Sequence, residues 1–250
     1  MLSDPIGEET GQNFAWVLGA YYLDLSERND ITDLGTYSNP FSPWPPYIQN
    51  VTGTRNYDSE NKALFGTFDY LLSETLSLSF GMRWEDWEAN YNDTFGEEFS
   101  PSDQMLGGKM SLIKDWSDEI NLYASIGRGY KAGGFNLGTG FSENLYSDRL
   151  IYDPEYLWNY EIGFNRQFAD SSTNLDLVVF YSDRKDQQVM ASTQVDPNDP
   201  NTFTFLTQNA ASGENYGMEL SIKSKPSDAL SLFASLLSLI HISEPTRRTP

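Results

Sequence analysis

The sequence lacks most of the residues on which active sites and metal centres depend. It has no cysteine and a single histidine, His241, in 250 residues. No Ser/His/Asp or Cys/His set can therefore be assembled from the rest of the chain. The acidic residues show no Asp-x-Asp-x-Asp-Gly spacing of a calcium loop. We expect a protein that is not an enzyme and that has no cofactor and no metal site.

Positive charge and long apolar runs are also scarce. The chain has 16 basic residues against 36 acidic ones, a formal net charge of −20. Phosphate binding requires lysine and arginine, so nucleic acid is not an expected partner. No apolar run is long enough for a transmembrane helix, which needs about 18 residues or more. The first residues, Met1–Pro5, have neither the basic region nor the apolar core of a signal peptide.

What the sequence does have is alternation of apolar and polar residues. The clearest case is the segment Leu76–Glu85, in which Leu, Leu, Phe, Met and Trp alternate with Ser, Ser, Gly, Arg and Glu. Successive side chains of a strand point to opposite faces, so this segment predicts a strand with one apolar and one partly charged face. A charged inner face requires water or a polar plug.

Eight further segments share this pattern and come in pairs joined by short polar turns. The predicted strands cover about residues 13–26, 62–72, 76–91, 106–114, 120–131, 156–168, 174–189 and 216–224, with a ninth from 230. Between the pairs lie long connections at about 27–60, 92–103, 132–153 and 190–212. Short turns at one end of a sheet and long loops at the other are typical of outer-membrane β-barrels.

The fold class that follows is all-β: an antiparallel up-and-down meander, part of a transmembrane β-barrel, with its apolar face against outer-membrane lipid. Ten side chains should lie on that convex face and be exposed, namely Leu76, Leu78, Phe80, Trp158, Ile162, Phe164, Leu177, Val179, Met218 and Leu220. Aromatic residues, 14% of the chain, gather near strand ends as in interfacial girdles. The alternative is a soluble β-sandwich with a solvated outer face, which does not explain the order of short and long loops.

The last fourteen residues differ from the rest. The string Leu-Ser-Leu-Ile-His-Ile-Ser-Glu-Pro-Thr-Arg, from residue 237, resembles a translated transposase-type sequencing adapter. We therefore expect residues 1–236 to be the barrel segment and 237–250 to be an artefact, unpaired from about Ser243. His241, the only histidine, is then no candidate for a metal ligand.

Three segments carry a family resemblance. They are Ser125–Asn136 with its Gly-Gly-Phe-Asn end, Tyr152–Gly163 with Pro-Glu and Tyr-Glu-Ile-Gly, and Phe180–Val189 followed by Asn209–Ser212 and Tyr216–Glu219. In this order and spacing they resemble the barrel of TonB-dependent receptors. The resemblance implies a barrel of about 22 strands with a plugged lumen. It also implies the outer membrane of a Gram-negative bacterium and uptake of a scarce ligand, often a ferric siderophore, energised by the TonB complex through a plug domain.

The chain departs from that pattern, because it shows about nine strands and neither a plug domain nor a TonB box. We expect an internal, by itself non-functional piece of the barrel. Two other functions stay open: a passive outer-membrane porin or channel, and a secreted, aromatic-rich β-protein that binds glycans.

Five residues are candidates for ligand binding. Trp44, Tyr47 and Tyr57 lie in the first long connection and could stack on a ligand, or pack on one another. Arg128 and Lys131 lie near the outer rim and could attract an anionic ferric complex, or pair with carboxylates of the barrel or the plug. Gly129, Gly133 and Gly134 permit the close backbone approach that is needed where a strand becomes a loop.

Overall fold

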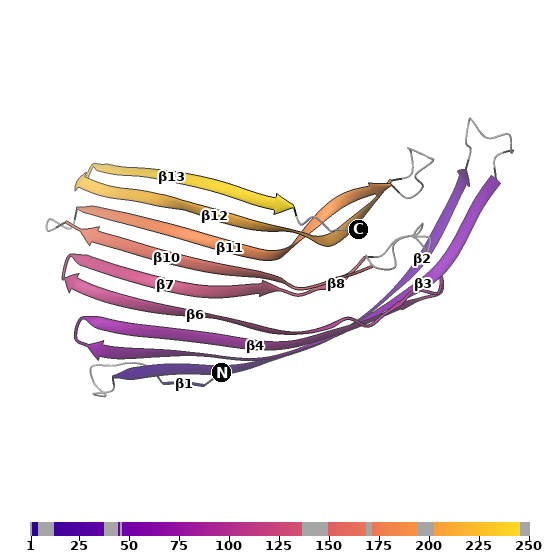
Figure 1. Cartoon of the computed structure of the whole chain (residues 1–250), viewed down its shortest axis with the longest axis horizontal. Coiled ribbons are helices and arrows are strands. Elements are labelled where there is room, and N and C mark those ends of the chain that lie inside the picture. Colours follow the sequence, from indigo (N-terminus) through magenta and orange to yellow (C-terminus); the bar gives the residue numbers. More distant parts are fainter. Residues whose placement is uncertain are drawn as a thin grey trace.

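The computed structural model consists of strands and the turns between them. It describes residues 2–4, 13–37, 45, 47–136, 150–168, 172–194 and 203–245. Within these ranges, no helix is long and apolar enough to cross a membrane. Figure 1 shows the strands side by side in one curved sheet, with the short turns together at one end and the longest strands extending from the other.

The sheet is an antiparallel meander in which each long strand pairs with its neighbours in sequence. Its order is β1-β2-β3-β4-β6-β7-β10-β11-β12-β13, with β5 beside β4, and β8 and β9 form a separate pair. The bounds are β1 Leu2–Asp4, β2 Phe14–Tyr37, β3 Tyr47–Ser73, β4 Leu76–Asp93, β5 Glu98–Phe99, β6 Ser102–Ser117, β7 Ile120–Lys131, β8 Gly134–Phe135, β9 Ile151–Tyr152, β10 Glu155–Gln167, β11 Thr173–Gln194, β12 Phe203–Ser227 and β13 Leu230–Pro245.

The all-β meander predicted from the sequence is confirmed, and each of its nine strands is present. The second sheet among the described residues is only the two-stranded pair β8-β9, which is too small to be the second layer of a soluble sandwich. The ten side chains expected on the apolar face are all exposed or half-buried. Ile162, for example, is 67% exposed and Val179 52%.

The strands are longer than predicted. The connection placed at 27–60 is mostly a continuation of β2 and β3, which pair without a break from Phe14↔Tyr70 to Tyr37↔Tyr47. The connection placed at 190–212 is likewise largely paired strand of β11 and β12. The prediction was wrong here because these extensions carry polar residues on both faces, so the alternation that marks a strand is lost.

The limit of the apolar belt is visible on β4. Its outward positions are apolar from Leu76 to Trp84 and then become Asp86, Glu88 and Asn90. The stretch Leu76–Trp84 has the length of a membrane-spanning strand, about 9–11 residues. The parts of β2, β3, β4, β6, β11 and β12 beyond this level therefore project out of the membrane.

The C-terminal strand extends further than predicted. β13 pairs with β12 from Ser227↔Leu230 to Ala211↔Pro245. The expectation of an unpaired chain from Ser243 is wrong for Ser243–Pro245, because the extended β12 offers ladder positions as far as Ala211. The adapter origin of residues 237–250 remains a prediction, since a strand of β13's composition pairs whatever its source.

Candidate functional site

The described parts of the connection between β7 and β10, residues 132–136 and 150–154, lie across the polar face of the sheet. Its two short strands, β8 and β9, pair through Gly134↔Tyr152 and Phe135↔Ile151. At its start, the Gly133 N–H donates to Asp103 Oδ2 of β6 at 3.2 Å. A Cβ on Gly133 would lie 2.5 Å from the carbonyl oxygen of Tyr152, so glycine is required for this close approach. We call residues 132–136 with 150–155 the cross-face segment.

Asn136 attaches the cross-face segment to a distant strand. Its side-chain Nδ2 donates to the Thr207 carbonyl and its Oδ1 accepts from the Thr207 N–H, both at 2.8 Å. Asn136 is only 8% exposed. This double hydrogen bond joins the end of the Gly-Gly-Phe-Asn motif to β12.

Two further residues, Asp153 and Glu155, attach the second part of the cross-face segment, residues 150–155, to β11 and β12. The Asp153 N–H donates to Asn209 Oδ1 at 2.7 Å, and Asn209 Nδ2 returns a bond to the Asp153 carbonyl at 2.8 Å. Glu155, 8% exposed, accepts from Arg184 Nη1 at 2.8 Å and from the Gln188 N–H at 2.9 Å. The three segments singled out in the sequence thus meet in one place.

Phe135 extends from the cross-face segment, on the same polar face, to the strands of the N-terminal half of the sheet. There it joins an aromatic cluster. Its ring centroid lies 6.1 Å from Tyr57, 5.3 Å from Tyr91 and 5.4 Å from Phe99. These partners come from β3, β4 and β5. Because one segment contacts both β3 and β12, far apart in the sheet order, the polar face is concave.

The cluster has a buried centre and a partly open rim. Tyr91 is 2% exposed, whereas Tyr57, Phe99 and Phe135 are half-buried. Burial, then the hydrogen bond from the Tyr91 hydroxyl to Asp93 Oδ2 at 3.0 Å, raises the pKa of Tyr91 to about 12. Burial, then the nearby Tyr57, also raises the pKa of Tyr152. Both hydroxyls are therefore harder to ionise than a free tyrosine, and the cluster presents ring faces suited to stacking.

Asp103 of β6 contacts the cross-face segment, and its surroundings disfavour the charged form of its carboxyl group. Burial, together with the neighbouring Asp153, raises the pKa of its carboxyl, although the Gly133 N–H lowers it. The bond to Gly133 thus stabilises a charge that the site otherwise disfavours.

Deeper on the concave face, a polar network joins three strands. Glu85 accepts from Arg83 Nε at 2.7 Å, from the Tyr130 hydroxyl at 2.7 Å and from Asn61 Nδ2 at 2.6 Å. The Arg83 guanidinium lies 5.6 Å from the Tyr21 ring. The charges predicted for the inner face are thus satisfied by one another.

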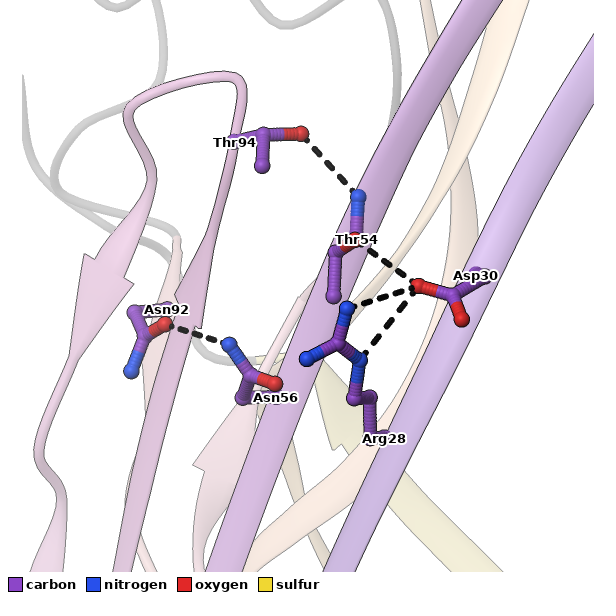
Figure 2. Close-up of polar contacts among 6 residues, drawn as sticks. All are labelled: Arg28, Asp30, Thr54, Asn56, Asn92 and Thr94. Carbon is purple, nitrogen blue, oxygen red and sulfur yellow. Dashed lines mark hydrogen bonds and ion pairs between the residues drawn. The ribbon is translucent and has the colours of Figure 1, made fainter.

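The outward side of the extensions of β2, β3 and β4 beyond the membrane carries polar residues that are exposed to solvent (Figure 2). Asp30 forms an ion pair with Arg28 at 3.3 Å and accepts from the Thr54 hydroxyl at 2.8 Å. Asn56 donates to Asn92 at 2.9 Å across β3 and β4. These solvated contacts connect strands that have left the membrane, and they contribute little stability individually.

The predicted site residues are found in different places. Trp44 lies outside the described residues, and Tyr47 is the first residue of β3, opposite Tyr37. Tyr57 belongs to the aromatic cluster, and Lys131 is exposed at the end of β7.

Arg128 lies on the apolar, convex face. The register puts it opposite Gly108 on one side and Trp158 on the other. The residues that sequence reasoning missed are Tyr91 and Phe99, which lie in an extension that it assigned partly to loop. Phe135 was noticed only as part of a motif.

The described residues contain no group of three or more His, Cys, Asp or Glu side chains that could hold a metal ion. What the concave face offers is a partly open, neutral aromatic surface held at the outer end of a curved sheet. This arrangement suits binding of a ligand with planar groups.

Comparison with known proteins agrees with this description. The family model described as "TonB dependent receptor-like, beta-barrel" matches residues 4–245. The probable TonB-dependent siderophore receptor PiuA of Acinetobacter baumannii is 20% identical over 188 residues, which cover 72% of this chain and 24% of that protein. The pesticin receptor of Yersinia enterocolitica is 23% identical over 215 residues, or 83% of this chain and 28% of that protein.

Solved structures show the same fold. The ferric yersiniabactin uptake receptor FyuA of Yersinia pestis matches 97% of this chain and 34% of its own, with a TM-score of 0.66 and 20% identity. The copper transporter OprC matches 92% of this chain and 36% of its own, with a TM-score of 0.64 and 14% identity. The chain thus spans about a quarter of the length of the curated relatives and about a third of these solved chains.

The family match covers almost the whole chain, and the apolar belt, short turns and long extensions are those of an outer-membrane barrel. The chain belongs to the β-barrel family of TonB-dependent receptors, proteins of the Gram-negative outer membrane.

Proposed function

We propose that this chain forms part of the barrel of an outer-membrane receptor that takes up a scarce ligand, in the first place a ferric siderophore or a similar iron complex. The observation that carries the proposal is the aromatic cluster of Tyr57, Tyr91, Phe99 and Phe135 on the concave face, held by the cross-face segment. Relatives named as a siderophore receptor and as a ferric yersiniabactin uptake receptor support it. Energy would come from the TonB complex through a plug domain.

The chemistry of the cluster bears on the kind of ligand. Its ring faces are available for stacking, and the Tyr91 hydroxyl donates a hydrogen bond to Asp93, which together with burial raises the pKa of Tyr91 to about 12. The iron would therefore be held by groups of the siderophore, while Tyr57, Phe99 and Phe135 contact the organic part. Trp44, Tyr47 and Lys131 are further candidates for contact with the ligand.

Net charge makes the proposal more specific. A chain with a charge of −20 attracts cationic complexes, repels strongly anionic ones and leaves neutral ones unaffected. The position of Arg128 on the convex face removes one of the two cations that could have offset this. We therefore propose a neutral or cationic iron complex in preference to a strongly anionic one.

Uptake of radiolabelled iron, and of radiolabelled copper in a parallel assay, tests the function. Cells that produce the full receptor would be offered a cationic ferric trihydroxamate, a strongly anionic ferric tricatecholate and free copper, with and without a protonophore. We expect saturable uptake of the trihydroxamate that the protonophore abolishes. Uptake that is unsaturable and insensitive to the protonophore would show a passive channel instead, and uptake of copper alone would assign a different cargo.

A further inference from the structure

The convex face is hollowed along β7. Ala124 is opposite Leu112 of β6 and Ile162 of β10, so a small side chain lies between two large ones. The hollow has a volume of about 760 Å³, and Leu78, Tyr160 and Val179 also line it. Most of its lining residues are at positions that face the membrane, and Ser125, Glu161 and Phe180, at the alternate positions, also border it.

A second hollow continues the first toward the outer end of the strands. It measures about 290 Å³ and shares Met110 and Ile126 with the first. Gly108 has no side chain to fill this hollow, and Arg128 and Trp158 line its outer end. The two together form an apolar groove with one cation at its outer end, which we call the membrane groove.

Arg128 is held but not neutralised. Its guanidinium lies 4.2 Å from the ring of Tyr156 and 5.9 Å from that of Trp158. Nη1 donates to the Leu106 carbonyl at 2.9 Å, while Nε has no hydrogen-bond partner among the described residues. In the same part of the chain no carboxylate forms an ion pair with it. The neighbouring cation on β11, Lys185, is engaged by Asp183 at 3.3 Å.

A charge on a lipid-facing surface is unfavourable unless it finds a partner at the interface. Arg128 lies at the level where the apolar belt ends, beside the aromatic pair Tyr156 and Trp158. This is the depth at which the anionic headgroup of a lipid is joined to its acyl chains. A guanidinium binds phosphate oxygens through several N–H groups at once.

We propose that the membrane groove binds one phosphorylated lipid of the outer leaflet, with a headgroup phosphate on Arg128 and an acyl chain over Gly108 and Ala124. The proposal goes beyond the uptake function and does not depend on the identity of the transported ligand. It rests on the geometry of the convex face alone.

Native mass spectrometry of the full receptor, extracted from outer membranes and delipidated in detergent, tests it. The probes are lipid A, dephosphorylated lipid A and inorganic phosphate. We expect one lipid A to bind, and dephosphorylated lipid A and inorganic phosphate to bind at least about tenfold more weakly. Arg128→Gln should weaken lipid A binding by about tenfold or more, and Arg128→Lys should retain part of it.

Ala124→Phe provides an independent variant, because it fills the groove and keeps the charge. It too should weaken lipid A binding by about tenfold. The matched control is Arg28→Gln, which removes an exposed cation of the outer extension and should leave lipid binding unchanged. Equal binding by the parent, Arg128→Gln and Ala124→Phe would overturn the proposal, as would equal binding of the two lipid A forms.

Discussion

Replacing Asn136 by alanine should release the cross-face segment from β12. The change removes two hydrogen bonds of 2.8 Å and leaves the N–H and C=O of Thr207 without their partner. A fully buried polar group left unpaired costs about 1–3 kcal/mol, which would give about 2–6 kcal/mol for the two; because Thr207 is half-buried, we expect a total of about 2–4 kcal/mol. The equilibrium constant for opening the segment should then rise by about 30-fold to 1000-fold.

Hydrogen–deuterium exchange of the full receptor in detergent measures this opening. The amides of Gly133–Asn136 and of Thr207 should exchange faster in Asn136→Ala, while the amides of β4 within the membrane belt should not change. Asn56→Ala is the matched control, because it removes an exposed amide pair of 2.9 Å and should alter stability by about 0.5 kcal/mol or less. Unchanged exchange at Thr207 would refute the argument that Asn136 holds the segment.

Three further predictions concern charge and chain identity. Because the native pKa of Asp103 is raised above 3.8, stability should fall as pH rises from that value through the native pKa. Asp103→Asn should remove this part of the pH dependence, measured by thermal unfolding, and an identical pH profile would contradict the assignment. Glu155→Ala leaves Arg184 without its carboxylate and should destabilise the protein by about 1–3 kcal/mol, whereas Glu155→Gln should do less because it still accepts a hydrogen bond. Resequencing the locus should show the native gene diverging at codon 237, and genomic reads that continue through 237–250 in frame would prove the tail to be real.

The strands within the membrane were predictable because one face meets lipid and the other does not. Leu76–Glu85 shows this pattern, and β7 was predicted with its bounds, Ile120–Lys131. Beyond the membrane neither face meets lipid, and the cross-face segment covers part of the concave face, so the outer halves of β2, β3, β11 and β12 have no regular alternation. The three residues of β1, Leu2–Asp4, are too few to show an alternating pattern, so its pairing with β2 was not predicted.

The site was predictable only in part. The Gly-Gly-Phe-Asn motif indicated an unusual segment after β7, but no local rule gives its partner Thr207, 71 positions away in sequence. The side of Arg128 follows from strand register: it is opposite Trp158, which was already assigned to the lipid face. Cross-strand pairing therefore indicates the face on which Arg128 lies, whereas its position near the end of the predicted strand does not.

Ligand binding to the aromatic cluster tests the central claim most directly. Calorimetric titration of the full receptor with the ferric trihydroxamate of the uptake assay would compare the parent with Phe135→Ala and Phe80→Ala. Phe135 contacts three rings of the concave face, whereas Phe80 is 41% exposed on the convex face. An aromatic contact with the ligand is worth about 0.5–1.5 kcal/mol beyond the area it buries, so Phe135→Ala is expected to bind about tenfold more weakly. Phe80→Ala should bind as the parent does, and equal affinity in all three proteins would contradict the account.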